Sequence, residues 1–152
     1  MIAVHERFDV PSDPRTVWKV LSKPHEVVGC VPGASLGEQH EDGSYDGSLT
    51  VKFGPTRVTF RARVSLELDD ATMTGRMTAQ GKDSQGGTRM KTGVSFNVTP
   101  HGPGSSVVSD GQVEISGRLA GIIEGGASMV VNRLSSEFAS NLAKRCAVEA
   151  AS

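Results

Sequence analysis

Groups that could perform acid–base chemistry are few in this sequence and lie far apart. Where apolar and polar residues alternate, the positions directed inward include four polar side chains: Glu6, Tyr45, Thr92 and Ser109. General acid–base catalysis needs titratable groups that converge on a substrate with shifted pKa values. Because these four residues fall in separate segments, we expect no catalytic residue. Glu6 is either a buried acid or a carboxylate at the rim of a sheet, and we favour the rim.

The histidines and cysteines lack the spacing of a metal site. The four histidines fall on an outward face, at a helix start and in two turns: His5, His25, His40 and His101. Cys30 and Cys146 are too isolated for a ligand pair or a disulfide framework, so we expect two reduced, largely buried thiols. No P-loop, dinucleotide fingerprint or nucleophile elbow occurs. The sequence therefore predicts no metal and no cofactor.

Cations gather between residues 50 and 91, where eight Lys and Arg compare with four Asp and Glu. Alternation directs several of them outward on adjacent strands, so they would form a positive stripe. Such a stripe could dock an acidic protein or an anionic membrane leaflet. The candidate docking residues are Arg57, Arg61, Arg63, Arg76, Arg89 and Lys91. The alternative is a solvated sheet face whose charges prevent aggregation.

Composition bounds the function. Sixteen Lys and Arg against seventeen Asp and Glu leave a formal net charge of −1, which argues against a nucleic-acid-binding protein. The N-terminus lacks the apolar segment of a signal peptide, and no apolar run approaches the roughly 18 residues of a membrane helix. We expect one cytoplasmic domain, residues 1–152, with no linker.

The element order predicts an α+β fold. Alternation over residues 2–10 predicts a strand, and two short helices follow, one from Pro14 and one over residues 25–31. Residues 34–117 alternate almost throughout, with a turn signal every ten to fifteen residues, which predicts six hairpin-linked antiparallel strands.

Residues 118–149 contain no proline and repeat their apolar residues at helical spacing, which predicts a helix about 45 Å long. Its apolar face comprises Leu119, Ile123, Ala127, Val130, Leu134, Phe138, Leu142 and Cys146. We therefore expect a curved seven-stranded antiparallel sheet to wrap this helix, with the two short helices at one end.

Small residues on both walls of that arrangement predict an apolar cavity. The inward small residues are Gly47, Ala62, Gly75, Ala79, Gly81 and Gly111, and the helix adds Gly121, Gly125, Gly126 and Ala127. The expected ligand-binding residues are Phe53, Phe60, Ala62, Met77, Met90, Thr92, Val94, Ser109, Gly121, Ile123, Gly125 and Met129. The alternative is that the glycines only let the helix approach the sheet and let the strands bend.

The element order also resembles the helix-grip fold of the START-like, SRPBCC superfamily. Ordered motifs resemble, more narrowly, the CoxG-type family, the G subunits of carbon monoxide dehydrogenase: Phe8-Asp9-Val10-Pro11, Cys30-Val31-Pro32-Gly33-Ala34, Asp42-Gly43-Ser44-Tyr45-Asp46-Gly47, Val51-Lys52-Phe53-Gly54-Pro55 and Gly117-Arg118-Leu119-Ala120-Gly121. Together they cover essentially the whole chain in the family's order.

The resemblance implies a non-catalytic accessory protein of a molybdenum hydroxylase of the carbon monoxide dehydrogenase type. Such proteins are implicated in recruiting the enzyme to the membrane and in carrying a hydrophobic ligand such as a quinone or lipid. Several members extend past the long helix into a membrane-contacting tail that this sequence lacks, so we expect peripheral contact with the inner face of the membrane at most. The alternatives are a polyketide cyclase/dehydrase-like enzyme using the same cavity and a structural adaptor with a filled core.

Overall fold

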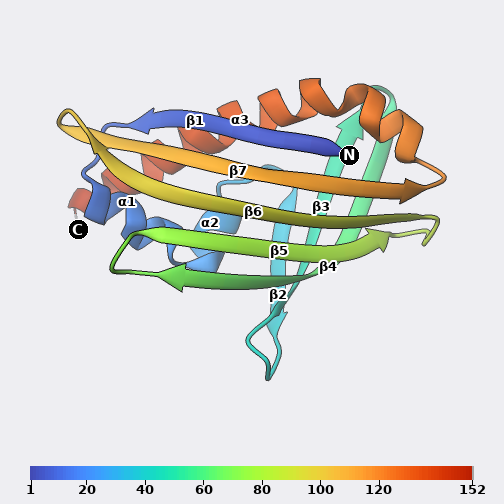
Figure 1. The fold of residues 1–152 in the computed structure, drawn as a ribbon, viewed down its shortest axis with the longest axis horizontal. Helices are drawn as coiled ribbons and strands as arrows, with labels where there is room; N and C mark the ends of the chain where they lie inside the picture. The colour runs from blue at the N-terminus through green and yellow to red at the C-terminus, as the bar shows by residue number, and fades with distance from the viewer. Residues whose placement is uncertain (152) are drawn as a thin grey trace.

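Seven antiparallel strands form a single sheet that curves around a long C-terminal helix (Figure 1). The computed structural model describes residues 1–151. In chain order the elements are β1 (Ile2–Val10), α1 (Pro14–Leu21), α2 (Pro24–Val28), β2 (Ala34–Gln39), β3 (Tyr45–Phe53), β4 (Thr56–Asp69), β5 (Thr74–Asp83), β6 (Thr88–His101), β7 (Gly104–Gly117) and α3 (Ala120–Ala151). The predicted α+β fold is confirmed.

α3 ends at Ala151 rather than Glu149, and two further helix boundaries differ from the prediction for reasons that hydrogen bonds explain. α2 ends at Val28 rather than Val31, because the N–H groups of Cys30 and Val31 donate to carbonyls three residues back, as in a tightened turn. α3 begins at Ala120 rather than residue 118, because the N–H of Arg118 donates to the carbonyl of Gly87 at 3.0 Å. That bond ties residue 118 to the turn between β5 and β6.

The sheet has the order β1-β7-β6-β5-β4-β3-β2, and it bends along β4. Residues 56–64 of β4 pair with β3, and residues 60–69 pair with β5. Figure 1 shows β2 and β3 running across the direction of β5, β6 and β7. α3 consequently contacts β1 at one edge of the sheet and β3 near the other, so the sheet wraps the helix.

Buried apolar side chains form two clusters at opposite ends of the space between the sheet and α3. The first, which we call the helix-end cluster, comprises Val10, Val17, Trp18, Val20, Leu21, Cys30, Val98, Val107, Leu142 and Cys146. The second, which we call the hairpin-end cluster, comprises Val51, Phe53, Val58, Phe60, Ile123 and Val130. α3 spans the distance between them, with Ile123 in one and Cys146 in the other.

α1 closes the helix-end cluster. The side chain of Asp13 accepts from the N–H of Thr16 and caps the helix, and Pro14 occupies its first turn. Trp18 lies in the cluster, and its Nε1 donates to Oδ1 of Asp70 at 2.8 Å, which fastens α1 to the turn between β4 and β5. The helix therefore covers this end of the sheet as predicted.

The glycines of the sheet do not leave empty volume, so that part of the cavity argument is wrong. A Cβ at Gly81 would overlap the backbone of Arg61, and one at Gly111 would overlap the backbone of Gly93. A Cβ at Gly75 would overlap the ring of Phe96. These glycines allow neighbouring strands and side chains to approach closely, which is the alternative considered from sequence.

The glycine contacts predict opposite effects for two alanine substitutions. Gly111→Ala should destabilise the protein by about 2 kcal/mol or more, because the new methyl group meets backbone that cannot move aside. Gly125→Ala, on α3, meets nothing within 4 Å and should stabilise by about 1 kcal/mol through helix propensity. Urea unfolding of both variants measures the difference, and equal effects would contradict this account of the sheet.

Both cysteines lie in the helix-end cluster and are fully buried, as expected. Burial raises the pKa of Cys30, and burial raises the pKa of Cys146 to about 11 from an ordinary value of 9.0. Raised thiol pKa values disfavour the thiolate, which is the nucleophilic form. The two thiols are therefore structural.

The raised pKa of Cys146 predicts a loss of stability in alkali. Between pH 9 and pH 11 the unfolded chain releases a proton that folded Cys146 retains, so the free energy of unfolding should fall as pH rises through this window. Urea titrations at intervals from pH 8 to pH 11 measure the slope. In Cys146→Ala the slope should be shallower, and an unchanged slope would contradict the assignment.

Candidate functional site

The middle of the sheet's inner face is lined by apolar side chains that are only half-buried. The strand register places Leu66, Met77, Val94, Gly111 and Val4 in one row across β4, β5, β6, β7 and β1. We call this the central row. All five residues are half-buried, although they lie on the face that packs against α3 at both ends of the sheet.

In the clusters at the two ends, side chains of the inner face are almost completely buried. Val98 and Val107 are 2% and 3% exposed in the helix-end cluster, and Val58 is 2% exposed in the hairpin-end cluster. On α3, Leu134 packs against the hairpin-end cluster and Phe138 packs against the helix-end cluster, and both are half-buried. The inner face is thus buried most completely in the two clusters and less completely over the central row.

The predicted ligand-binding residues separate into three groups. Six lie on the inner face and are half-buried: Met77 and Val94 in the central row, Thr92 and Ser109 two residues from it, and Ala62 and Met90 four residues from it, where Met90 packs against the hairpin-end cluster. Phe53, Phe60 and Ile123 belong to the hairpin-end cluster, with exposures of 9% or less. These three fill one end of the space.

The expected positions of Gly121, Gly125 and Met129 on the inner wall are wrong. At about 100° per residue, Gly121 and Gly125 lie on the opposite side of α3 from Ile123, and Met129 lies about 120° away from it. Both glycines are exposed, and Met129 is 78% exposed. The prediction placed these three residues inside because they are small or apolar. Residue type alone does not identify the buried side of a helix, which depends on angular position.

Polar groups on the inner face do not converge. The hydroxyl of Thr92 donates to the carbonyl of Gln112 at 2.9 Å, and the ring of Tyr45 packs edge-on against His25 at 6.1 Å. Glu6 is half-buried on the inner side of β1, which is an edge strand of the sheet, and it pairs in register with Ser109 on β7. No pair of these groups forms a hydrogen bond within residues 1–151.

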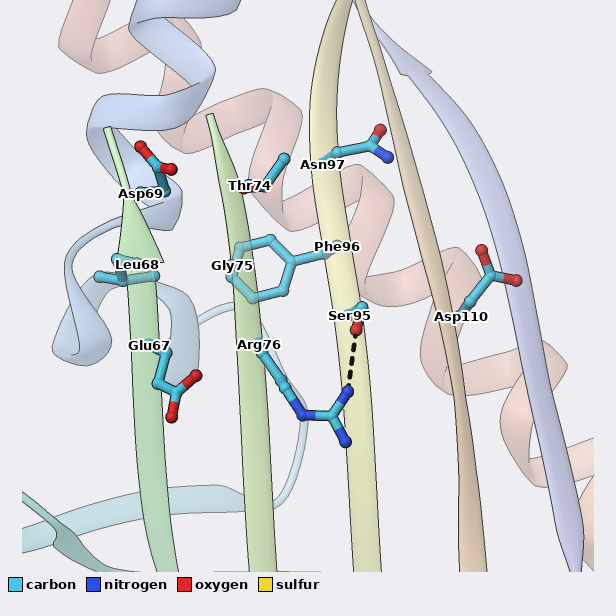
Figure 2. A pocket seen from close by; sticks show the side chains of 10 residues that line it. All are labelled: Glu67, Leu68, Asp69, Thr74, Gly75, Arg76, Ser95, Phe96, Asn97 and Asp110. Atoms are coloured by element: carbon cyan, nitrogen blue, oxygen red, sulfur yellow. Dashed lines mark hydrogen bonds between the residues drawn. The ribbon is translucent and has the colours of Figure 1, made fainter. Parts of the chain in front are cut away.

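Two hollows lie on the outer face of the sheet. The first has a volume of about 410 Å³, and Figure 2 shows Glu67 and Asp69 of β4 and Asp110 of β7 pointing away from one another. Arg76 donates to the hydroxyl of Ser95 at 3.3 Å across its middle. The second, of about 490 Å³, lies over Gly93 between β5, β6 and β7. Both hollows are open to solvent and the charged side chains of the first diverge, so neither offers a catalytic constellation.

The outer face also carries the predicted docking residues, all of them exposed: Arg57, Arg61, Arg63, Arg76, Arg89 and Lys91. The register adds a feature that alternation alone did not reveal. Arg61, Lys82 and Arg89 stand directly opposite one another on β4, β5 and β6, and we call them the cationic row. Like charges in direct opposition destabilise a sheet, so this arrangement needs a reason.

Carboxylates do not neutralise the cationic row. Arg63 lies 3.6 Å from Asp46, Lys19 lies 3.2 Å from Glu149, and Arg145 lies 2.6 Å from Glu26. Among the described residues, none of the three members of the cationic row has a carboxylate within 4.0 Å. The ends of the row are the neutral residues Ser48 and Ser116.

Residues 1–151 contain neither a metal-binding cluster nor a membrane-spanning helix. His, Cys, Asp and Glu side chains of this part of the chain nowhere gather into a group of three that could hold a metal ion. None of its helices combines the length and the apolar character needed to cross a membrane.

Solved structures share this architecture at low sequence identity. A conserved protein from Geobacillus kaustophilus is 18% identical, with 97% of this chain and 95% of that chain covered, at a TM-score of 0.81. The Zhui aromatase/cyclase from Streptomyces sp. R1128 is 15% identical, with 95% of this chain and 92% of that chain covered, at a TM-score of 0.64. A START superfamily protein from Mycobacterium smegmatis is 14% identical, with 95% of this chain and 99% of that chain covered, at a TM-score of 0.63. At such identities the likeness shows the fold alone.

The sequence has no significant match among curated proteins. It does match the CoxG family, described as the G subunit of carbon monoxide dehydrogenase, and the match runs from residue 7 to residue 147. The matched range contains the central row apart from Val4, both end clusters and the cationic row. The resemblance noted in the sequence motifs is thus confirmed, and the chain belongs to the CoxG family of carbon monoxide dehydrogenase G subunits.

Proposed function

We propose that this protein carries a hydrophobic small molecule, such as a quinone or a lipid, in the space between the central row and α3. The observation that carries the proposal is the incomplete burial of the central row between two fully packed clusters. Apolar surface left accessible in an otherwise packed interior is stabilised by an apolar occupant. A ligand there would complete the core.

A carrier fits the inner face better than a catalyst. Catalysis by acid–base chemistry needs groups held within hydrogen-bond reach of each other and of a substrate. Glu6, Tyr45, Thr92 and Ser109 instead lie on four different strands, and both thiols are buried in the helix-end cluster. The shared fold of an aromatase/cyclase favours the cyclase alternative, but the inner face lacks a group of converging polar side chains that could perform acid–base catalysis.

Family membership supports an accessory role beside a molybdenum hydroxylase of the carbon monoxide dehydrogenase type. In this role the protein binds the enzyme and exchanges its ligand at the inner face of the cytoplasmic membrane. Ile122 and Met129, 48% and 78% exposed on the outer side of α3, provide apolar surface for that peripheral contact.

Filling the proposed ligand space tests the carrier function. Val94→Trp places a large ring over the central row and should weaken binding of ubiquinone-2 at least tenfold while leaving the unfolding midpoint nearly unchanged. Ser95→Trp, one residue along on the outer face, is the matched control and should bind normally. Titration calorimetry and thermal unfolding give the two readouts.

A filled core would give the opposite result. Val94→Trp would then cost about 1–3 kcal/mol of stability through overpacking, and the wild-type protein would bind no quinone or extracted lipid. Turnover of an aromatic polyketide substrate by the wild-type protein, lost in Val94→Trp, would instead support the cyclase.

The cationic row provides the surface on which we place the partner enzyme. Two of its three members are arginines, whose planar guanidinium groups bind carboxylates in a bidentate manner. Polar residues such as Ser48 and Ser116 flank the row. An acidic protein surface is therefore the expected occupant, and Lys52 and Arg57, directly opposite each other on β3 and β4, extend the charge.

Neutralising the row tests this docking surface. The triple variant Arg61→Gln, Lys82→Gln and Arg89→Gln should weaken binding to purified carbon monoxide dehydrogenase about tenfold or more at low salt, with less effect at high salt because of screening. The control carries Arg15→Gln, Lys23→Gln and Lys144→Gln, which make the same charge change at exposed positions elsewhere. Surface plasmon resonance measures both.

Two outcomes would contradict the assignment. If the triple variant and the control bound the enzyme equally well, the cationic row would not be the docking surface. If the triple variant lost binding to vesicles containing phosphatidylglycerol but kept its binding to the enzyme, the row would serve the membrane instead.

A further inference from the structure

The second hollow on the outer face of the sheet lies over a gap in a row of side chains. The register places Gly93 in line with Ser65, Thr78 and Gln112, across β4, β5, β6 and β7, and Gly93 has no side chain to fill its place in the row. We call the space above it, of about 490 Å³, the Gly93 hollow. Its neighbours in the row are two hydroxyls and an amide, so the floor of the hollow is neutral and can donate hydrogen bonds.

Three cations line the Gly93 hollow from two sides. Arg63 and Lys91 belong to the row on one side of Gly93, and Arg76 belongs to the row on the other side. Among the described residues that line the hollow, Glu114 is the only carboxylate. Three cations and one carboxylate leave a formal net charge of +2. A concave surface with an excess of one sign of charge concentrates ions of the opposite sign, so the hollow attracts anions.

Arg76 is held over the hollow rather than paired with a carboxylate. Its Nη1 donates to the hydroxyl of Ser95 at 3.3 Å, and Figure 2 shows the side chain reaching toward β6 and away from Glu67. Glu67 lies opposite Arg76 in the register, yet the two charges form no ion pair within residues 1–151. A Cβ at Gly93 would lie 3.2 Å from Nη2 of Arg76, which places this nitrogen above the Gly93 backbone.

Lys91 likewise lacks a carboxylate partner. Glu114 lies opposite Lys91 in the register, but no carboxylate of the described chain comes within 4.0 Å of the lysine. Arg63 differs from the other two cations, because its Nε lies 3.6 Å from Asp46. Two of the three charges at the hollow are therefore not neutralised by the protein itself.

We propose that the Gly93 hollow is a binding site for a phosphate monoester. Such a group carries a charge of about −1.5 to −2 at neutral pH, which matches the formal charge of the lining. A guanidinium can bind two phosphate oxygens in parallel, and a lysine ammonium binds phosphate as a point charge. The hydroxyl and amide side chains of the floor can donate to the remaining oxygens. The site lies on the opposite face of the sheet from the proposed carrier space, and it depends neither on the carrier function nor on the cationic row.

Ribose 5-phosphate tests the site with a soluble phosphate monoester, and vesicles containing phosphatidic acid test it with a lipid headgroup. Gly93→Val fills the hollow without a change of charge, and its Cβ meets only the flexible end of the Arg76 side chain, so the variant should fold. It should weaken binding of the phosphate compound roughly tenfold or more, and so should the double variant Arg76→Gln and Lys91→Gln.

The matched control carries Arg15→Gln and Lys23→Gln, which make the same charge change at exposed positions on and beside α1. At physiological salt it should retain the wild-type affinity, because charges beyond about 8 Å are screened. Titration calorimetry measures binding of ribose 5-phosphate, vesicle co-sedimentation measures binding of phosphatidic acid, and thermal unfolding checks that each variant is folded.

The two probes identify the source of the phosphate. Binding of ribose 5-phosphate that both the Gly93→Val and the double variant lose would support a soluble ligand. Binding of phosphatidic acid alone, lost in the same variants, would support a lipid headgroup in the same site. If the wild-type protein bound neither compound, or if the binding survived in Gly93→Val and in the double variant, the proposal would be overturned.

Discussion

The structure depends on how tightly the sheet can bend. A sheet that contacts α3 with both β1 and β3 must curve more than ordinary side chains allow at every position. Gly81 and Gly111 allow neighbouring strands to approach closely, because each faces the backbone of a neighbouring strand where a methyl group would not fit. The bend along β4 then brings the hairpin of β3 and β4 against the first half of α3.

The curvature in turn divides the core. The sheet and α3 meet closely near the two ends, where bulky residues such as Phe60 at one end and Leu142 at the other are buried. Between these ends, side chains of the central row and of α3 do not reach full burial. A domain can tolerate this because the two packed clusters hold the helix in place. The proposed ligand would bind in the stretch between the clusters, so that different parts of one interior would provide stability and binding.

Much of this arrangement followed from patterns in the sequence. Strict alternation fixed which residues of β4 and β6 face inward, and helical spacing identified the buried side of α3, because both patterns depend on local geometry. The functions of the glycines did not follow, since a glycine facing empty space and one facing a backbone look identical in sequence. Met129 was misplaced because its apolar character outweighed its angular position, and the cationic row emerged only from the strand register.

The environment of the only tryptophan has a practical consequence. Trp18 is 6% exposed, is held by Asp70, and lies 6.1 Å from the ring of Phe96, which covers Gly75 and adjoins Ser109 in the register. The indole is held in place and shielded from water, and only the ring of Phe96 separates it from the proposed ligand space. The protein consequently contains a natural fluorophore whose emission reports on what occupies its interior, without any label attached.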